Sequence, residues 1–240
     1  MKIYVNGCSF VYGDELDDRA NQSWPALLGQ KFNATVVNDA MLGGSNARTV
    51  YRTIKHLDQD FDLYVIAWTF DHKFTFYKSD SNIEVNFNPK LNDLTYGSED
   101  YYRIWGRTLY QTWYNRLYGF KLWLQQILQL QAMLYLHDRR YLMINAADNN
   151  LSRWSVDQDQ FIDSVKSLIN FDIMNDEQIF AEYEEIQYYI NEIDQSTFYN
   201  WDTFTIRSLC KQFETGPRGH FLEAGHQHLA NLIYNHLCSV

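Results

Sequence analysis

The segment NGCSFVYGD, residues 6–14, places a serine between two glycines directly after the first strand-like run of the chain. That run, residues 2–5 (KIYV), is short, β-branched and aromatic, which predicts a buried strand, and Gly7 ends it with a residue free to adopt positive φ. Ser9 then has its Oγ at the carboxyl end of a strand, where open α/β sheets bind their ligands. A serine at this place can also be only a turn or helix-capping residue. The segment therefore predicts an α/β sheet and makes Ser9 a candidate nucleophile.

The composition is that of a folded, acidic protein. The 240 residues suffice for one substantial core, and 46% hydrophobic and 17% aromatic residues exclude a disordered chain. A formal charge of −10 without a basic cluster argues against nucleic acid as a partner. The first residues lack the segments of a signal peptide, and no apolar run is long enough to span a bilayer. We therefore expect a cytoplasmic protein of one domain without a membrane partner, while the oligomeric state stays open.

The cysteines Cys8, Cys210 and Cys238 are odd in number and far apart, with no CxxC and no regular Cys/His spacing. Neither a disulfide framework nor a structural zinc site is predicted. Cys8 precedes Ser9 at the strand end, so we expect its side chain to point away from that of Ser9 and to pack in the core.

Strand-like and helix-like segments alternate along the chain. Buried strands are predicted at residues 2–5, 34–38, 61–68 and 141–145, and helices at residues 23–32, from the loop at 41–46 to about 57, and 109–138. Such alternation implies parallel strands joined by right-handed crossovers. The polar and glycine-rich loops that follow the strands then emerge at one edge of the sheet.

Two segments depart from this alternation. Residues 73–107 form an aromatic-rich insertion, which is either a lid or binding loop beside the strand ends or a surface insertion packed by its own rings. Its rings belong to Phe74, Phe76, Tyr77, Tyr96, Tyr101, Tyr102 and Trp105. Residues 146–215 form a helical insertion, with helices near 157–169 and 176–193 whose acidic residues we interpret as a solvated face rather than metal ligands. Residues 200–204 (NWDTF) are a candidate rim for a cleft.

The segment GPRGHFLEAGHQHL, residues 216–229, places His220 in a glycine-rich loop before the last predicted helix. A histidine there can be carried back over the sheet edge to meet Ser9. His220, His226 and His228 could in principle converge on a metal, but their spacing does not fit one helical face well. The sequence therefore predicts no metal site and no cofactor.

Together these blocks resemble the GDSL or SGNH hydrolase family, in particular short members encoded by bacteria and phages. The matching blocks are residues 6–14, 38–52, 62–71 and 216–230, and the most informative elements are GxSxxxG around Ser9 and HFxxxGH from His220. The resemblance implies a flavodoxin-like, three-layer α/β/α fold with a central parallel sheet, and an active site at the carboxyl ends of the strands. It covers the core of the chain as a single domain, residues 1–240, that carries the two insertions.

The resemblance also implies roles for individual residues. Ser9 would be the nucleophile and His220 the base that accepts its proton, because serine is too weakly acidic to attack an ester unaided. The backbone N–H groups of Ser9 and Gly44 would face the developing oxyanion. His226 matches a position that supports the final helix.

Two departures from the family pattern affect these roles. The usual aspartate three residues before the histidine is replaced by Pro217. Glu214, Glu223 or a main-chain carbonyl would have to orient His220, or a Ser-His dyad suffices, and we favour the dyad. The usual oxyanion asparagine after the third strand is also absent, since residues 68–71 read WTFD. Asn46 is the substitute we consider, with helix capping as its alternative role.

These residues predict a serine esterase or O-deacetylase that hydrolyses a small acyl ester through an acyl-Ser9 intermediate. A glycan ester is one substrate class considered, because rings in the insertion and around Trp201 could stack on sugars. An O-acyltransferase on the same scaffold is the enzymatic alternative. A degenerate hydrolase kept as a ligand-binding or assembly protein is the alternative from another class. Geometry discriminates between them, because catalysis requires Ser9 and His220 within hydrogen-bond reach.

Overall fold

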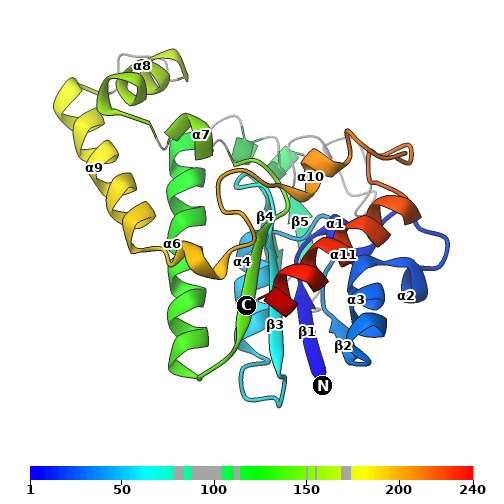
Figure 1. The fold of residues 1–240 in the computed structure, drawn as a ribbon. Helices are drawn as coiled ribbons and strands as arrows, with labels where there is room; N and C mark the ends of the chain where they lie inside the picture. The colour runs from blue at the N-terminus through cyan, green and yellow to red at the C-terminus, as the bar shows by residue number, and fades with distance from the viewer. Residues whose placement is uncertain are drawn as a thin grey trace.

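The chain folds around a four-stranded parallel sheet with helices on both faces (Figure 1). The computed structural model describes residues 1–77, 84–87, 104–106, 108–110, 114–149, 151–154, 156–168 and 174–239. The strands of the sheet are β1 (Lys2–Asn6), β2 (Thr35–Asn38), β3 (Leu63–Trp68) and β6 (Tyr141–Asn145), in the order β2-β1-β3-β6. All neighbouring pairs are parallel, so the four carboxyl ends share one edge. The predicted three-layer α/β/α fold with a central parallel sheet is confirmed.

The described helices lie close to the predicted ranges. They are α1 (Ser9–Tyr12), α2 (Arg19–Gln22), α3 (Trp24–Phe32), α4 (Asn46–Ile54), α6 (Arg116–Leu136), α7 (Leu151–Trp154), α8 (Gln158–Leu168), α9 (Asp176–Glu192), α10 (Ile206–Leu209) and α11 (Glu223–Ser239). The long crossover α6 begins seven residues later than the sequence pattern indicated. Its start is fixed by Asn115, whose side chain accepts the N–H of Leu117 and thereby caps the helix.

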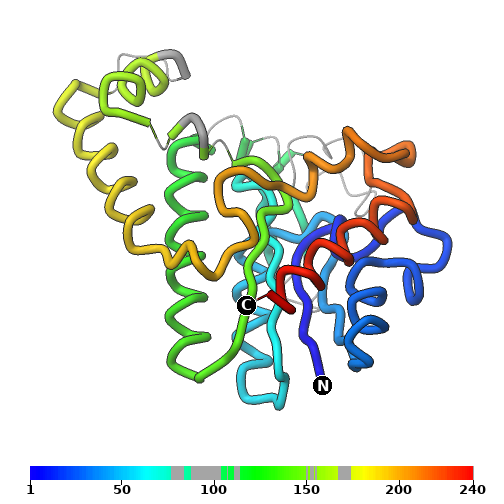
Figure 2. The backbone as a smooth tube through the Cα atoms, in the orientation of Figure 1, coloured from blue at the N-terminus to red at the C-terminus, as the bar shows by residue number. Residues whose placement is uncertain are grey.

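Side chains alternate between two hydrophobic cores, one on each face of the sheet. Tyr4 of β1 points into the core beneath α4 and α6, whereas Ile3 and Val5 point into the core beneath α3 and α11. The first core also takes in Trp123 of α6, and the second takes in Trp24 of α3. Figure 2 shows how α11, the last helix, returns across the sheet beside β1 and α3, so that the two ends of the chain pack together.

The described part of residues 73–107 includes a short antiparallel pair, β4 (Phe74–Tyr77) and β5 (Glu84–Phe87). The Trp105 ring contacts Phe76 and Phe87 with centroid distances of 4.7 and 5.1 Å. Thr75 Oγ1 accepts a hydrogen bond from Ser45 Oγ (2.8 Å), which attaches this pair to the loop before α4. The side chain of Tyr77, and Tyr96, Tyr101 and Tyr102, lie outside the described residues.

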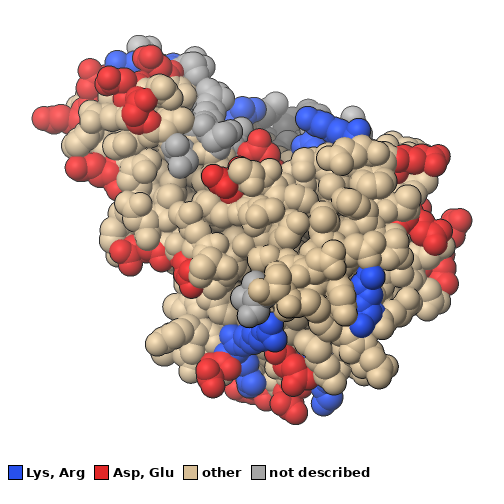
Figure 3. All heavy atoms as spheres, viewed as in Figure 1, with Lys and Arg blue, Asp and Glu red and all other residues tan. Residues whose placement is uncertain are grey.

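Helix α9 packs beside α6, and α9 and α8 together project from the main body (Figure 2). Two acids of α9 face α6, where Glu182 and Glu185 each lie 2.7 Å from the Lys121 ammonium. Other acids are exposed, and Figure 3 shows Asp and Glu side chains gathered over this part of the molecule. In the part of the chain that the structure describes, no helix is both long enough and apolar enough to cross a membrane.

Candidate active site

Buried polar contacts fix the backbone that leads to Ser9. Asn6, the last residue of β1, is fully buried; its side-chain amide donates to Thr49 O (3.2 Å), and its Oδ1 accepts the Gly7 N–H (2.8 Å). A Cβ on Gly7 would lie 2.6 Å from a methyl group of Val11, so only glycine fits at this turn. The chain therefore leaves β1 on a fixed path and places Ser9 at the carboxyl edge of the sheet, as the first residue of α1.

His220 meets Ser9 at this edge. Its Nε2 lies 2.8 Å from Ser9 Oγ. The loop that carries His220 is closed by a hydrogen bond from the Gly216 N–H to the His220 carbonyl (2.9 Å), and the Phe10 ring packs 4.8 Å from the imidazole. The Ser9 hydroxyl is therefore engaged with a histidine, and the alternative of a serine that only caps a turn or a helix is wrong.

Glu15 orients the imidazole. Its Oε2 lies 3.0 Å from His220 Nδ1 and also accepts the His220 backbone N–H (3.0 Å), while Oε1 accepts the Arg218 N–H (2.7 Å). The favoured hypothesis placed no acid beside His220, but the Glu15 carboxylate lies there, and neither Glu214 nor Glu223 takes this place. Nε2 faces Ser9 and Nδ1 faces a carboxylate, which is the arrangement in which imidazole accepts a proton from a hydroxyl.

The surroundings keep the Glu15 carboxylate ionised and in place. Burial acts to raise the pKa of Glu15, but the N–H groups of Arg218 and His220 and the imidazole outweigh it and hold this pKa below its usual range. A Cβ on Gly216 would overlap Glu15 Oε1, so the glycine makes room for the carboxylate. Asp14 supports the same loop through an ion pair with the Arg218 guanidinium (2.8 Å).

One feature of the sequence could have indicated Glu15 as the acid beside His220. Asp14 and Glu15 are the first acids after Ser9 in the sequence. In the structure, Gly13 caps the end of α1, and Glu15 has a left-handed backbone (φ 70°). The acid was expected close to His220 in the sequence, because the family has its aspartate three residues before the histidine. In this chain the acid comes from beside the serine.

The residues expected to face the oxyanion are differently engaged. The Gly44 N–H donates to Met41 O (3.1 Å). Asn46 Nδ2 donates to Thr69 O (3.0 Å) and its Oδ1 accepts the Thr69 N–H (2.7 Å). Asn46 does not cap α4. Ser45 is the capping residue, and its Oγ accepts the N–H of Arg48 (3.2 Å). The capping alternative for Asn46 was therefore wrong, and its amide anchors the end of β3.

Thr69 is the centre of a buried network that the sequence analysis did not identify. Besides Asn46, the Asn149 side chain donates to Thr69 O (2.9 Å) and accepts the Asp71 N–H (3.1 Å). The Lys73 ammonium donates to Thr69 Oγ1 (3.0 Å). These contacts fix the turn after β3, beside the strand that leads to Ser9.

The other two histidines of the last segment have separate environments. His226 is buried and its Nδ1 accepts the Trp24 N–H (3.1 Å), which ties α11 to the start of α3. Burial lowers the pKa of His226 to about 3, so the imidazole is neutral at physiological pH. His228 packs its ring against Phe213 at 5.1 Å. Among the residues that the structure describes, no group of three His, Cys, Asp or Glu side chains could hold a metal ion.

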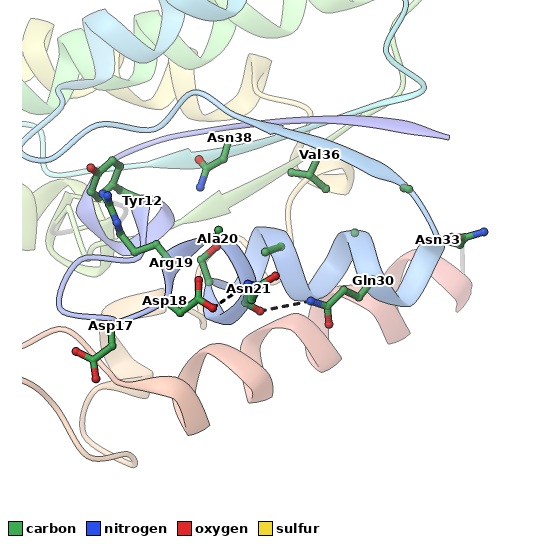
Figure 4. Close-up of a pocket in the computed structure, with 14 residues that line it drawn as sticks. Tyr12, Asp17, Asp18, Arg19, Ala20, Asn21, Gln30, Asn33, Val36 and Asn38 are labelled. Atoms are coloured by element: carbon green, nitrogen blue, oxygen red, sulfur yellow. Dashed lines mark hydrogen bonds between the residues drawn. The ribbon is translucent and has the colours of Figure 1, made fainter.

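One hollow lies near this edge of the sheet, and another lies away from it. The first, of about 660 Å³, is lined by the end of β6 and by residues of the predicted rim such as Asp202 and Thr203, and it reaches Arg207 and Gly219, the residue before His220. The Trp201 ring also lines it but is stacked on Trp123 (5.6 Å, 4°) and mostly buried, so it offers little face to a sugar. The other, of about 940 Å³, lies between β2 and helices α2 and α3, away from Ser9 and His220 (Figure 4).

A family model described as a family of unknown function, DUF6071, matches residues 13–163, more than half of the chain. The chain belongs to DUF6071. No curated protein matches the DUF6071 chain. The matched segment contains Glu15 but ends before His220 and begins after Ser9.

Several solved hydrolase structures are similar in fold to the DUF6071 chain. The psychrotrophic esterase EstA from a Pseudoalteromonas species is 10% identical, with 99% of this chain and 97% of that chain covered and a TM-score of 0.50. A G-D-S-L family lipolytic protein from Desulfitobacterium hafniense is 12% identical, with 98% of each chain covered and a TM-score of 0.47. A protein described as an SGNH hydrolase from Slackia heliotrinireducens is 10% identical, with 98% and 97% covered and a TM-score of 0.43. The predicted relation to the SGNH and GDSL hydrolases is confirmed at the level of the fold.

Proposed function

We propose that the chain is a serine hydrolase that cleaves a small acyl ester through an acyl-Ser9 intermediate. The observation that carries this proposal is the continuous chain of contacts from Ser9 Oγ through the His220 imidazole to Glu15, with distances of 2.8 and 3.0 Å. Both distances are within the reach that proton transfer requires. A histidine and a buried, ionised carboxylate aligned on one serine hydroxyl is what activation of a weak nucleophile needs.

The reaction follows from the positions of these atoms. His220 Nε2 accepts the Ser9 proton as Oγ forms a bond to the ester carbonyl carbon, and Glu15 holds the Nδ1–H and stabilises the imidazolium. The imidazolium then gives that proton to the leaving alcohol as the C–O bond breaks. A water molecule, deprotonated by His220, attacks the acyl-Ser9 carbonyl, and the carboxylate product leaves as Ser9 regains its proton.

The oxyanion needs donors, and the Ser9 N–H is the first of those we propose. It is at the start of α1 and makes no hydrogen bond among the described residues. The Gly44 N–H and the Asn46 amide are the further candidates. Each would act only if substrate drew it away from Met41 or Thr69, since catalytic hydrogen bonds can form only in the substrate complex. The engagement of both donors is the observation that favours the second candidate function, a ligand-binding protein without turnover.

Ester turnover tests the proposal. We expect purified protein to release acid from 4-nitrophenyl acetate or from acetylated sugars, and Ser9→Ala to abolish it. Ser196→Ala is the matched control, because this serine is exposed and its Oγ donates a hydrogen bond to Asp194, two residues earlier in the chain (2.6 Å). Turnover that survives in Ser9→Ala would overturn the mechanism. Folded protein that hydrolyses no ester but binds acetylated ligands would favour the binding function, and faster acyl release on addition of a sugar or amine acceptor would indicate a transferase.

A further inference from the structure

Two cations lie near the same aromatic ring. This ring is at the carboxyl edge of the sheet, where Ser9 also lies. Phe70 follows β3, and the Lys73 ammonium and the Arg207 guanidinium each lie 5.2 Å from its ring centroid. Lys73 comes from the turn after β3, and Arg207 comes from α10, far away in the sequence. The fold has therefore brought two like charges to the same aromatic ring, which has a repulsive cost.

Neither cation has an ionic partner within the described part of the chain. Lys73 is buried, and its hydrogen-bond partner is the neutral hydroxyl of Thr69 (3.0 Å). Burial, and then repulsion by Arg207, lower the pKa of Lys73, while Cys8 acts in the opposite direction. Buried charges in proteins are normally paired, so this cluster, formed by Lys73, Phe70 and Arg207, lacks a negative group.

The cluster lies next to the candidate active site. Phe70 follows β3, which pairs with β1, the strand that leads to Ser9, and neighbouring strands lie about 5 Å apart. Arg207 lines the 660 Å³ hollow together with Gly219, the residue before His220. The cluster and Ser9 therefore lie at the ends of neighbouring strands, and an ester with its carbonyl at Ser9 would have to extend in that direction to reach the cluster. Figure 3 shows basic side chains at the upper edge of the molecule, where α10 lies, and acidic side chains over α8, α9 and the opposite side.

We propose that the cluster of Lys73, Phe70 and Arg207 binds a negatively charged group, a carboxylate or a phosphate, carried by the substrate. This inference rests on the proposed ester hydrolysis, because it assumes that the bound molecule is an ester substrate. The negative charge of that substrate is inferred from the cluster itself. The planar guanidinium of Arg207 can hold two oxygens of such a group, and the Lys73 ammonium adds a second positive charge near the same ring. On a chain of net charge −10, a local pair of cations is also what allows an anionic ester to approach.

Matched esters test the proposal and locate the charge. Phenyl acetate is neutral, phenyl hemisuccinate carries its carboxylate on the acyl side, and 4-carboxyphenyl acetate carries it on the alcohol side. We expect kcat/KM for one of the charged esters to exceed that for phenyl acetate by about tenfold. Arg207→Gln, at an exposed position, and Lys73→Met are expected to remove this preference, whereas Lys211→Gln, an exposed cation that lines the same hollow, is expected to keep it. Equal kcat/KM for charged and neutral esters would overturn the proposal.

Inorganic phosphate provides a test that does not need turnover. We expect phosphate to raise the Tm of the wild type relative to sodium chloride at equal ionic strength, and Arg207→Gln to lose this shift while Lys211→Gln keeps it. If no ester is hydrolysed and the phosphate shift depends on Arg207, ester hydrolysis fails and the anion site stands. If esters are hydrolysed without charge preference and phosphate gives no Arg207-dependent shift, the anion site fails and ester hydrolysis stands.

Discussion

The side of the site that would transfer protons and the side that would bind the oxyanion use their polar groups differently. Ser9, His220 and Glu15 point at one another, so their hydrogen bonds are those that nucleophile activation requires. Gly44 and Asn46 give their hydrogen bonds to the backbone of Met41 and Thr69. One side thus has the contacts that the proposed proton transfer requires, whereas the polar groups of the other side hold the loop before α4 and the end of β3 in place. The comparison predicts a graded series of mutational effects.

The largest effect is expected at the base. His220→Gln removes the group that accepts the Ser9 proton, so the rate at which a fluorophosphonate labels Ser9 should fall by about ten-thousandfold. His228→Gln is the matched control, because among the described residues this ring packs against Phe213, away from Ser9. A His220→Gln variant that labels at more than a tenth of the wild-type rate would show that another group activates the serine.

The next effect is expected at the acid. Glu15→Gln keeps the shape of the side chain but removes the charge that stabilises the imidazolium, so labelling should slow by roughly a hundredfold to ten-thousandfold. Glu214→Gln, at an exposed position in the same region, should label like the wild type. If Glu15→Gln also labelled like the wild type, the Ser-His dyad would be sufficient for activation. The Glu15 carboxylate would then only stabilise the loop that carries His220.

Gly216→Ala probes the same carboxylate without changing its chemistry. The new Cβ would overlap Glu15 Oε1, so Glu15 must shift away from His220. We expect labelling to slow by about ten- to a hundredfold, the usual consequence of a displaced catalytic contact. Gly219→Ala is the control for space, since a Cβ at Gly219 meets no atom within 4 Å, although its positive φ of 83° adds strain. Equal rates for Gly216→Ala and the wild type would mean that the position of Glu15 is not critical.

Ser9, His220 and Glu15 also show what could and could not be predicted from the sequence. The strands and helices follow from local patterns of apolar residues, and the places of Ser9 and His220 follow from their being at the carboxyl end of β1 and before the last helix. Glu15 was missed because the family pattern, which relates Ser9 to His220 across 211 positions, places the acid beside the histidine, and no local pattern indicates a contact between residues 205 positions apart. The hydrogen bonds of Asn46 to Thr69 were not predicted either, since Thr69 lies at the end of another strand.

Asn46→Ala sharpens the comparison from the other side. The substitution leaves the buried Thr69 N–H without its acceptor, so the free energy of unfolding should fall by about 1–3 kcal/mol. If Asn46 only holds the end of β3, labelling of the folded variant should slow by less than about tenfold, because a lost oxyanion donor would cost a hundredfold or more. Urea unfolding and labelling rates measured on the same variant separate the two roles. A hundredfold loss of rate with unchanged stability would assign Asn46 to the oxyanion.

The smallest effect on rate is expected at His226, which supports the fold through Trp24. Its pKa is lowered in the folded state to about 3, so protonation favours the unfolded chain, and stability is complete above pH 6.5 and is lost as the pH falls toward 3. Between pH 7 and pH 5 this residue should lower the free energy of unfolding by about 2 kcal/mol. Urea unfolding at both pH values should show this loss in the wild type and not in His226→Gln. An identical pH dependence in the two proteins would contradict the assignment.

Site-resolved labelling with a fluorophosphonate tests the central claim most directly. The reagent forms a stable bond only to an activated serine hydroxyl, and peptide mapping then identifies the residue that carries the adduct. If His220 and Glu15 activate Ser9, the wild type carries one adduct, on Ser9, and Ser9→Ala carries none. An adduct on another serine, or a folded wild type that does not react at all, would contradict the account.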